Sequence, residues 1–205
     1  MITNYEELSP NHIDVLREIG NIGAGNAASS LATMLDERIN ISLPLVKISD
    51  FNDAIHAMGG AETMTVGVLI NYSGEANGMI MFLIEIETAK KLVSHMLKDF
   101  DNADEMTELK LSAIKEMGNI LGSSYIGSIA SLTGLEIHLS IPYVSIDMAG
   151  ALMSVPIIEF GAIGDKVMFI EESFLIEDAQ FASNVVMFAE IDTLTLIMER
   201  LGLGL

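Results

Sequence analysis

Two stretches of the chain carry a carboxylate and a carboxamide at the same spacing. Glu18 and Asn21 lie three residues apart, as do Glu116 and Asn119. Residues at this spacing share one face of an α-helix, so each pair would project from one side of its helix. An amide can orient a water molecule, and a carboxylate can bind a lysine of another protein. Such a pair suits hydrolysis of a phosphoryl group held by a partner, a reaction that depends mainly on placing water in line.

Each pair lies within a longer polar stripe. Asp14 precedes Glu18 by one turn, and Ser112 precedes Glu116 by one turn. Apolar residues fall on the opposite side of both helices, so the stripes are expected to face outward. An ordinary solvated face is the alternative for either stripe alone. Its occurrence at the same position of two stretches favours a functional interpretation.

A glycine precedes each asparagine inside the helical pattern, as Gly20 and Gly118. Glycine in a helix costs about 1 kcal/mol relative to alanine, and an unexplained local cost often marks a functional site. The missing side chain would also let the backbone of another protein approach closely. The sequence therefore predicts that this part of both helices meets a partner.

The two stretches belong to an internal duplication. Residues 13–44 align with residues 111–142 without a gap, and several polar residues recur in step. Repeats decide the fold prediction, so they come before the individual elements. The two copies, about 9–100 and about 105–205, predict a single pseudo-symmetric domain over residues 1–205.

Each copy has the pattern of a helix, strands and a closing helix. The first helix is expected after the start signal Ser9–Asn11, and its counterpart near Thr107 or Glu108. Closing helices are expected at 87–97 and 192–201. Alternating or continuous apolar segments predict strands at 38–44, 65–71, 78–84, 136–142, 152–160, 166–174 and 184–191. The expected fold class is α+β, a pseudo-two-fold duplication with an antiparallel or mixed sheet and two long motif-bearing helices on its surface.

Composition limits the partners and the compartment. The 205 residues include 10 lysines and arginines against 29 aspartates and glutamates, a formal net charge of −19. This charge argues against nucleic-acid binding, which needs clustered basic residues, and suits a partner with a basic face. No apolar run approaches the roughly 18 residues of a membrane-spanning helix, and the polar N-terminus lacks a signal-peptide pattern. The absence of cysteine makes a reducing cytoplasm the expected compartment.

Both stretches resemble the signature of the CheC/CheX/FliY family of bacterial chemotaxis phosphatases. That signature is Asp or Ser, three residues, Glu, two residues, Asn, twenty-two residues and Pro. The chain satisfies it twice, with Asp14, Glu18, Asn21 and Pro44, and with Ser112, Glu116, Asn119 and Pro142. The resemblance covers essentially the whole chain. CheX-type members carry one motif and FliY-type members an additional flagellar-switch domain, so two motifs and an end at Leu205 lead us to expect a CheC-type protein.

The resemblance implies hydrolysis of the aspartyl phosphate of the response regulator CheY. Glu18 and Glu116 would pair with a lysine near the phospho-aspartate. Asn21 and Asn119 would insert into the regulator and position the attacking water. The Mg²⁺ that this reaction needs would belong to the regulator, so no cofactor or metal site is expected in this chain.

The remaining motif residues are implied in supporting roles. Asp14 and Ser112 would contribute to the contact with the regulator, and Pro44 and Pro142 would shape the sheet behind the helices. Family members also bind the receptor deamidase CheD, and Asp147 lies in a segment that resembles the CheD-binding region. An ordinary acid at a strand end is the alternative for Asp147. Association with the flagellar or receptor machinery is implied in the same way.

A non-enzymatic adaptor module for CheD and phosphorylated CheY is the second functional hypothesis. The acidic composition and the lack of an enclosed-looking catalytic pocket motivate it.

Other patterns carry less weight. Residues 23–28 fit a dinucleotide fingerprint but lie within a helical pattern, and residues 99–110 lack the glycine and glutamate of a calcium loop. The four histidines have no ligand spacing, and the 14 methionines are interpreted as core residues.

Overall fold

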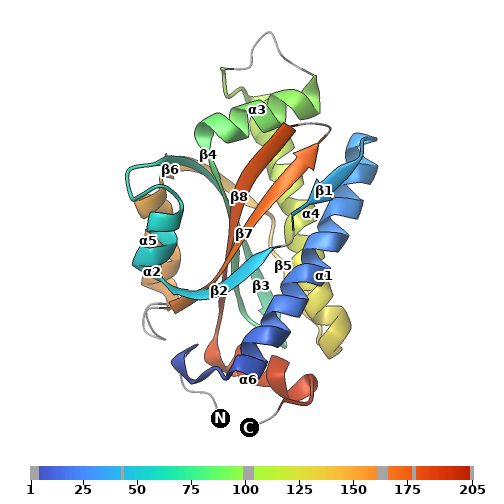
Figure 1. Ribbon diagram of the computed structural model, residues 1–205, viewed down its shortest axis with the longest axis vertical. Coiled ribbons are helices and arrows are strands. Elements are labelled where there is room, and N and C mark those ends of the chain that lie inside the picture. Colours follow the sequence, from blue (N-terminus) through green and yellow to red (C-terminus); the bar gives the residue numbers. More distant parts are fainter. Residues whose placement is uncertain (1–4, 43, 99–103, 161–165, 177–178, 204–205) are drawn as a thin grey trace.

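A curved antiparallel sheet forms the centre of the molecule in this computed structural model, which describes residues 5–42, 44–98, 104–160, 166–176 and 179–203. Two long helices, α1 and α4, lie side by side on one face of the sheet (Figure 1). Two shorter helices, α2 and α5, cover the other face. No helix of the described parts combines the length and the apolar character that crossing a membrane requires.

The elements follow the same order in both halves of the chain. After the short 3₁₀ helix η1 (Tyr5–Glu7), the first half contains α1 (Pro10–Leu35), β1 (Ile39–Ile41), β2 (Leu45–Asp50), α2 (Phe51–Ala57), β3 (Met64–Gly74), β4 (Gly78–Glu85) and α3 (Ile86–Leu97). The second half contains α4 (Glu108–Thr133), β5 (Ile137–Leu139), β6 (Tyr143–Met148), α5 (Ala149–Phe160), β7 (Lys166–Ile176), β8 (Ala179–Ala189) and α6 (Ile191–Arg200). The predicted α+β class with an antiparallel sheet is confirmed.

The two halves exchange strands across the sheet. The strand order is β1-β7-β8-β4-β3-β5, with β2 also paired to β7 and β6 also paired to β3. The short strands of each half therefore pair with a long strand of the other half, and β4 pairs with β8 at the centre. An unpaired strand edge leaves backbone groups without partners. Each half thus depends on the other for the backbone hydrogen bonds of its short strands.

The two long helices begin at the residues that the sequence indicates. The Ser9 side chain accepts a hydrogen bond from the backbone N–H of His12, and His12 Nδ1 accepts one from the backbone N–H of Ser9. Thr107 caps α4 in the same way, through the backbone N–H of Lys110. Such caps satisfy backbone donors that the first turn of a helix leaves free. They fix the register of both motif stripes relative to the sheet.

The glycines beside the motif asparagines face the sheet, which corrects the prediction that they admit a partner. A Cβ atom added to Gly20 would lie 2.9 Å from Cγ2 of Val46, and one added to Gly118 would collide with Cγ1 of Val68. Carbon atoms in contact prefer about 3.5–4.0 Å. Glycine at these positions allows each helix to lie close to the sheet. Its cost in helix propensity is offset by packing within the protein itself.

A polar cluster ties α1, α4 and the sheet together. The ring of Tyr125 lies over Gly23, where an added Cβ would be 2.7 Å from the ring. The Tyr125 hydroxyl donates a 2.5 Å hydrogen bond to Oε2 of Glu172, a buried residue of β7. Farther along, Nδ2 of Asn26 donates to Oγ of Ser128 at 3.1 Å. These contacts fix the spacing between the two motif helices.

Several predicted elements differ from the structure. Residues 152–160, predicted as a strand, belong to helix α5, because a short apolar run does not distinguish a strand from a helix that is half covered by a sheet. Helix α2 and the strands β2 and β6 are absent from the prediction, and β8 starts at Ala179 rather than at residue 184. Most of the charged joint at 99–106 lies outside the described residues.

Glu172 gives the fold a specific dependence on pH. Burial raises the pKa of its carboxyl group from 4.5 to about 7, although hydrogen bonds from Tyr125 and Ser183 act in the opposite direction. A carboxyl group whose pKa is higher in the folded state stabilises the fold most below its unfolded value, here 4.5. That contribution is lost as the pH rises through about 7 and amounts to on the order of 3 kcal/mol.

We therefore expect the substitution Glu172→Gln, which can keep both hydrogen bonds, to become more favourable as the pH rises. Relative to wild type, its free energy of unfolding should increase by up to about 3 kcal/mol between pH 5 and pH 8. Urea unfolding at the two pH values measures this difference. Glu171→Gln, which changes the neighbouring half-buried carboxylate that pairs with Lys47, is the control. An equal effect of Glu172→Gln at both pH values would contradict the assignment.

Candidate functional site

The motif side chains lie on the outward faces of α1 and α4. Glu18 and Glu116 are exposed, and Asn21 and Asn119 are half-buried one turn farther along. In the described residues neither glutamate forms an ion pair or a hydrogen bond with another side chain. Both carboxylates are therefore available to bind a cation supplied from outside the protein.

All four motif residues of the second half line one surface cavity of about 380 Å³. Ser112, Glu116 and Asn119 contribute from α4, and Pro142 contributes from the connection between β5 and β6. Beyond Asn119 the chain completes α4, turns, and runs back through the short strand β5 before it reaches the proline. This path explains why the motif spans so many residues, because Pro142 returns beside the same helix.

The first half places its motif on the equivalent elements. Asp14, Glu18 and Asn21 lie on α1, and the buried Pro44 lies between β1 and β2. Arg17 forms an ion pair with Asp14, with Nη1 2.7 Å from Oδ1. In the second half the position of Asp14 is taken by Ser112, which carries no charge. The two motif surfaces therefore differ in electrostatic charge.

The amide oxygen of Asn21 is buried and accepts no hydrogen bond from a described residue. A buried acceptor without a donor costs roughly 1–3 kcal/mol, so the folded protein carries a local cost at this atom. No internal hydrogen bond has to break before the amide of Asn21 can bind a water molecule. The sequence predicted a local cost in stability at this position. That cost therefore lies in the unsatisfied amide of Asn21 and not in the neighbouring Gly20.

Asp147 lies away from both motif surfaces. It is exposed near the end of β6, and its Oδ1 accepts a 2.8 Å hydrogen bond from the backbone N–H of Met148. Together with Leu152 and Val155 of α5, it lines a cavity of about 240 Å³. Side chains alternate along a strand, and Ile146 of the same strand faces α4. A ligand at Asp147 would thus approach the opposite face of the sheet.

One polar residue of the second site was not predicted from the sequence. Lys115 lines the same cavity as Glu116 and Asn119. It precedes Asn119 by four residues, a spacing that puts both on one helix face and could have identified it. Within the described residues there is no group of three histidine, aspartate or glutamate side chains that could hold a metal ion. The arrangement can therefore bind charged groups of a partner and orient water.

Comparisons with known proteins find similarity to chemotaxis phosphatases. A model described as the CheC-like family matches residues 12–48, and a model described as chemotaxis phosphatase CheX matches residues 66–156. The Bacillus subtilis protein named CheY-P phosphatase CheC is 29% identical over 206 residues, which cover 98% of this chain and 99% of that protein. The flagellar motor switch phosphatase FliY of the same species is 28% identical over 150 residues, covering 71% of this chain and 38% of FliY.

A solved structure shows the same fold. The crystal structure of Thermotoga maritima FliY superposes with a TM-score of 0.74 at 24% identity, covering 96% of this chain and 98% of that one. The likeness extends over the sheet and the helices on both of its faces, because nearly all of each chain is matched.

The unsatisfied amide oxygen leads to a prediction for stability. We expect Asn21→Ala to raise the free energy of unfolding by about 1 kcal/mol, because alanine is the better helix former and the buried acceptor disappears. Asn26→Ala on the same helix is the matched control, since it loses the hydrogen bond to Ser128 and should gain nothing. Thermal unfolding of both variants measures the difference. A destabilised Asn21→Ala would show that the amide supports the fold.

Proposed function

We propose that this chain, which is similar to CheC-type proteins over nearly its full length, is a chemotaxis phosphatase that hydrolyses the aspartyl phosphate of the response regulator CheY. One observation carries the proposal: each long helix presents an unpaired glutamate and a half-buried asparagine on its outward face. The relative named CheY-P phosphatase CheC, similar over nearly its full length, supports the choice of substrate.

In the proposed reaction the protein supplies position rather than a nucleophile. A water oxygen forms a bond to phosphorus while the bond from phosphorus to the aspartate oxygen breaks. The aspartate leaves as a carboxylate with the electron pair, and both water protons leave with inorganic phosphate. The amide of Asn21 or Asn119 would hold the water in line, and preorganised polar groups of this kind lower the barrier most where the reaction site is shielded from bulk water.

The glutamates would bind the partner. Glu18 or Glu116 would pair with a lysine beside the phosphorylated aspartate, and this contact would fix the regulator so that the asparagine enters its site. The net charge of −19 would steer a basic surface toward both helices and speed the encounter at low ionic strength. The Mg²⁺ bound by the regulator would balance the phosphoryl charge.

The remaining motif residues would shape the contact surface. Asp14 and Ser112 lie one turn before the glutamates, where they would meet the rim of the regulator. Pro44 and Pro142 are buried beside the helices and would hold the connecting loops against them. The proposed reaction takes place in the cytoplasm.

Removing both amides tests the proposed reaction. We expect the double substitution Asn21→Ala/Asn119→Ala to lower the acceleration of phosphate release from phosphorylated CheY with Mg²⁺ by on the order of 10²–10³. Binding should persist, because the glutamates remain. Asn26→Ala provides the control for a change of asparagine elsewhere on α1. A double variant as fast as wild type would exclude the proposed role of the amides.

A CheD-binding adaptor is the second candidate function. It is favoured by the position of Asp147, because a partner bound there would leave both motif surfaces open. Such a protein could join CheD, phosphorylated CheY and the receptor or flagellar machinery without chemistry of its own. The name of the similar protein FliY, a flagellar motor switch phosphatase, supports a connection to the motor.

Reversing the charge of Asp147 tests the adaptor surface. Asp147→Lys is expected to weaken CheD binding at least tenfold, because a contact with a charged group is worth roughly 1.5–3 kcal/mol. Glu199→Lys, an equal charge change on the exposed side of α6, is the control. Isothermal titration measures both affinities. If the two variants bind CheD equally well, Asp147 has no part in the contact.

A further inference from the structure

Each motif site has one basic residue at the same position, and the two sites differ in whether that residue is paired with a carboxylate. Lys115 of α4 stands at the position of Arg17 in α1, and each precedes a motif asparagine by four residues. At the first site Arg17 pairs with Asp14 at 2.7 Å, which directs its guanidinium along the helix away from Asn21. At the second site Ser112 replaces the aspartate. Lys115 forms no hydrogen bond or ion pair with any residue that the structure describes.

Most of the basic residues in this acidic chain are paired with a carboxylate. Within the described parts of the chain, six of the 10 lysines and arginines form ion pairs, namely Arg17, Lys47, Lys90, Lys98, Lys166 and Arg200. Arg38 and Lys91 form none there, like Lys115, but neither of them lines the motif cavity. Lys110 is fully buried. The chain has 29 acidic residues, so carboxylates that could pair with a lysine are abundant. The environment of α4 instead leaves the Lys115 ammonium exposed at the motif.

Lys115 lies where a partner would meet the second site. It lines the cavity of about 380 Å³ together with Glu116 and Asn119, and also an adjoining cavity of about 360 Å³ together with Tyr143. Tyr143 is 68% exposed, and Ile141 on the same loop is 81% exposed. The ammonium therefore sits between the polar motif and an exposed apolar wall, a surface that suits docking of a protein.

We propose that Lys115 contacts an anionic oxygen of the partner at the second site, and that the first site lacks this contact because Asp14 holds Arg17. The oxygen belongs either to the phosphoryl group or to a carboxylate beside it. This inference rests on the proposed function. Glu116 attracts a cation of the partner and Lys115 an anion next to it, so the two side chains together match a surface on which opposite charges alternate.

The contact acts through charge alone. In phosphoryl transfer the transition state spreads negative charge over the equatorial oxygens, and a nearby cation stabilises it. The contact forms and breaks no covalent bond, so no further group is needed to balance the reaction. Loss of a contact with the phosphoryl group would lower kcat, whereas loss of a contact with the neighbouring carboxylate would raise KM.

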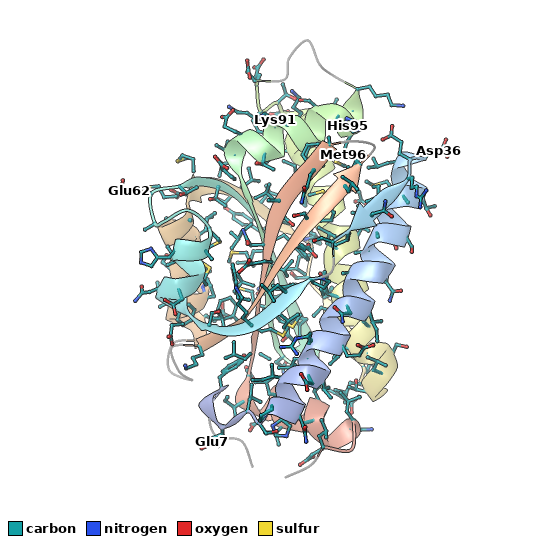
Figure 2. All side chains as sticks on the ribbon, in the orientation of Figure 1. Glu7, Asp36, Glu62, Lys91, His95 and Met96 are labelled. Atoms are coloured by element: carbon teal, nitrogen blue, oxygen red, sulfur yellow. The ribbon has the colours of Figure 1, made fainter. Side chains whose placement is uncertain are left out.

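The test isolates each site. In the Asn21→Ala protein only the second site keeps its amide, and there Lys115→Ala should lower kcat/KM for phosphate release from phosphorylated CheY with Mg²⁺ by on the order of tenfold. Lys115→Arg should retain most of the rate. Lys91→Ala removes a lysine from the exposed side of α3 and changes the net charge equally (Figure 2), so it serves as the matched control. Equal values of kcat/KM for Lys115→Ala and Lys91→Ala would overturn the inference.

The reciprocal change tests the first site. In the Asn119→Ala protein, Asp14→Ser should release Arg17 and raise kcat/KM severalfold, and an unchanged value would overturn the stated reason for the asymmetry. An inactive Asn21→Ala protein beside an active Asn119→Ala protein would overturn the role of Lys115 and leave the proposed function standing. If neither single-site protein exceeds the Asn21→Ala/Asn119→Ala variant, the proposed function fails and this inference with it.

Discussion

The close approach of the two long helices to each other and to the sheet is the constraint on which the rest of the structure depends. Gly20 and Gly118 remove the side chains that would keep α1 and α4 away from Val46 and Val68. Tyr125 then fills the space between the helices. Once the inner face of each helix is fixed against the sheet, helical geometry determines which residues lie on its outer face. The glutamates and asparagines are directed outward because the glycines beside them are directed inward.

The exchange of strands gives each motif surface a wall that depends on the opposite half of the chain. Pro142 leads into β6, which pairs with β3 of the first half, and Pro44 leads into β2, which pairs with β7 of the second half. A loop held only by its own ends would move relative to the helix beside it. Here the sheet fixes both loops next to α1 and α4, so the cavity at the second site is largely preformed.

The sequence was sufficient for the elements that local chemistry determines. Caps at Ser9 and Thr107 mark the helix starts, and the motif spacing puts acid and amide on one face. Residues 152–160 were predicted as a strand because α5 also carries apolar residues on its exposed side, among them Ile158 at 84% exposure, so the sequence shows no clear helical period there. The packing role of Gly20 could not be predicted for a different reason. The neighbour that requires a glycine is Val46, which is distant in sequence and adjacent only in the folded protein.

The two halves carry acid and amide on equivalent helices, but the charges around them differ. The ion pair between Arg17 and Asp14 is exposed, and such pairs contribute roughly 0–1 kcal/mol, so it adds little to the stability of α1. Its main consequence is electrostatic, because Asp14 neutralises Arg17. Lys115, the equivalent cation of α4, has no such carboxylate partner among the described residues. Two helices at equivalent places in the fold can therefore carry the same acid and amide and still differ in the charge around them. Geometry then decides which reaction a site can support, whereas the neighbouring charges decide how a partner is held there.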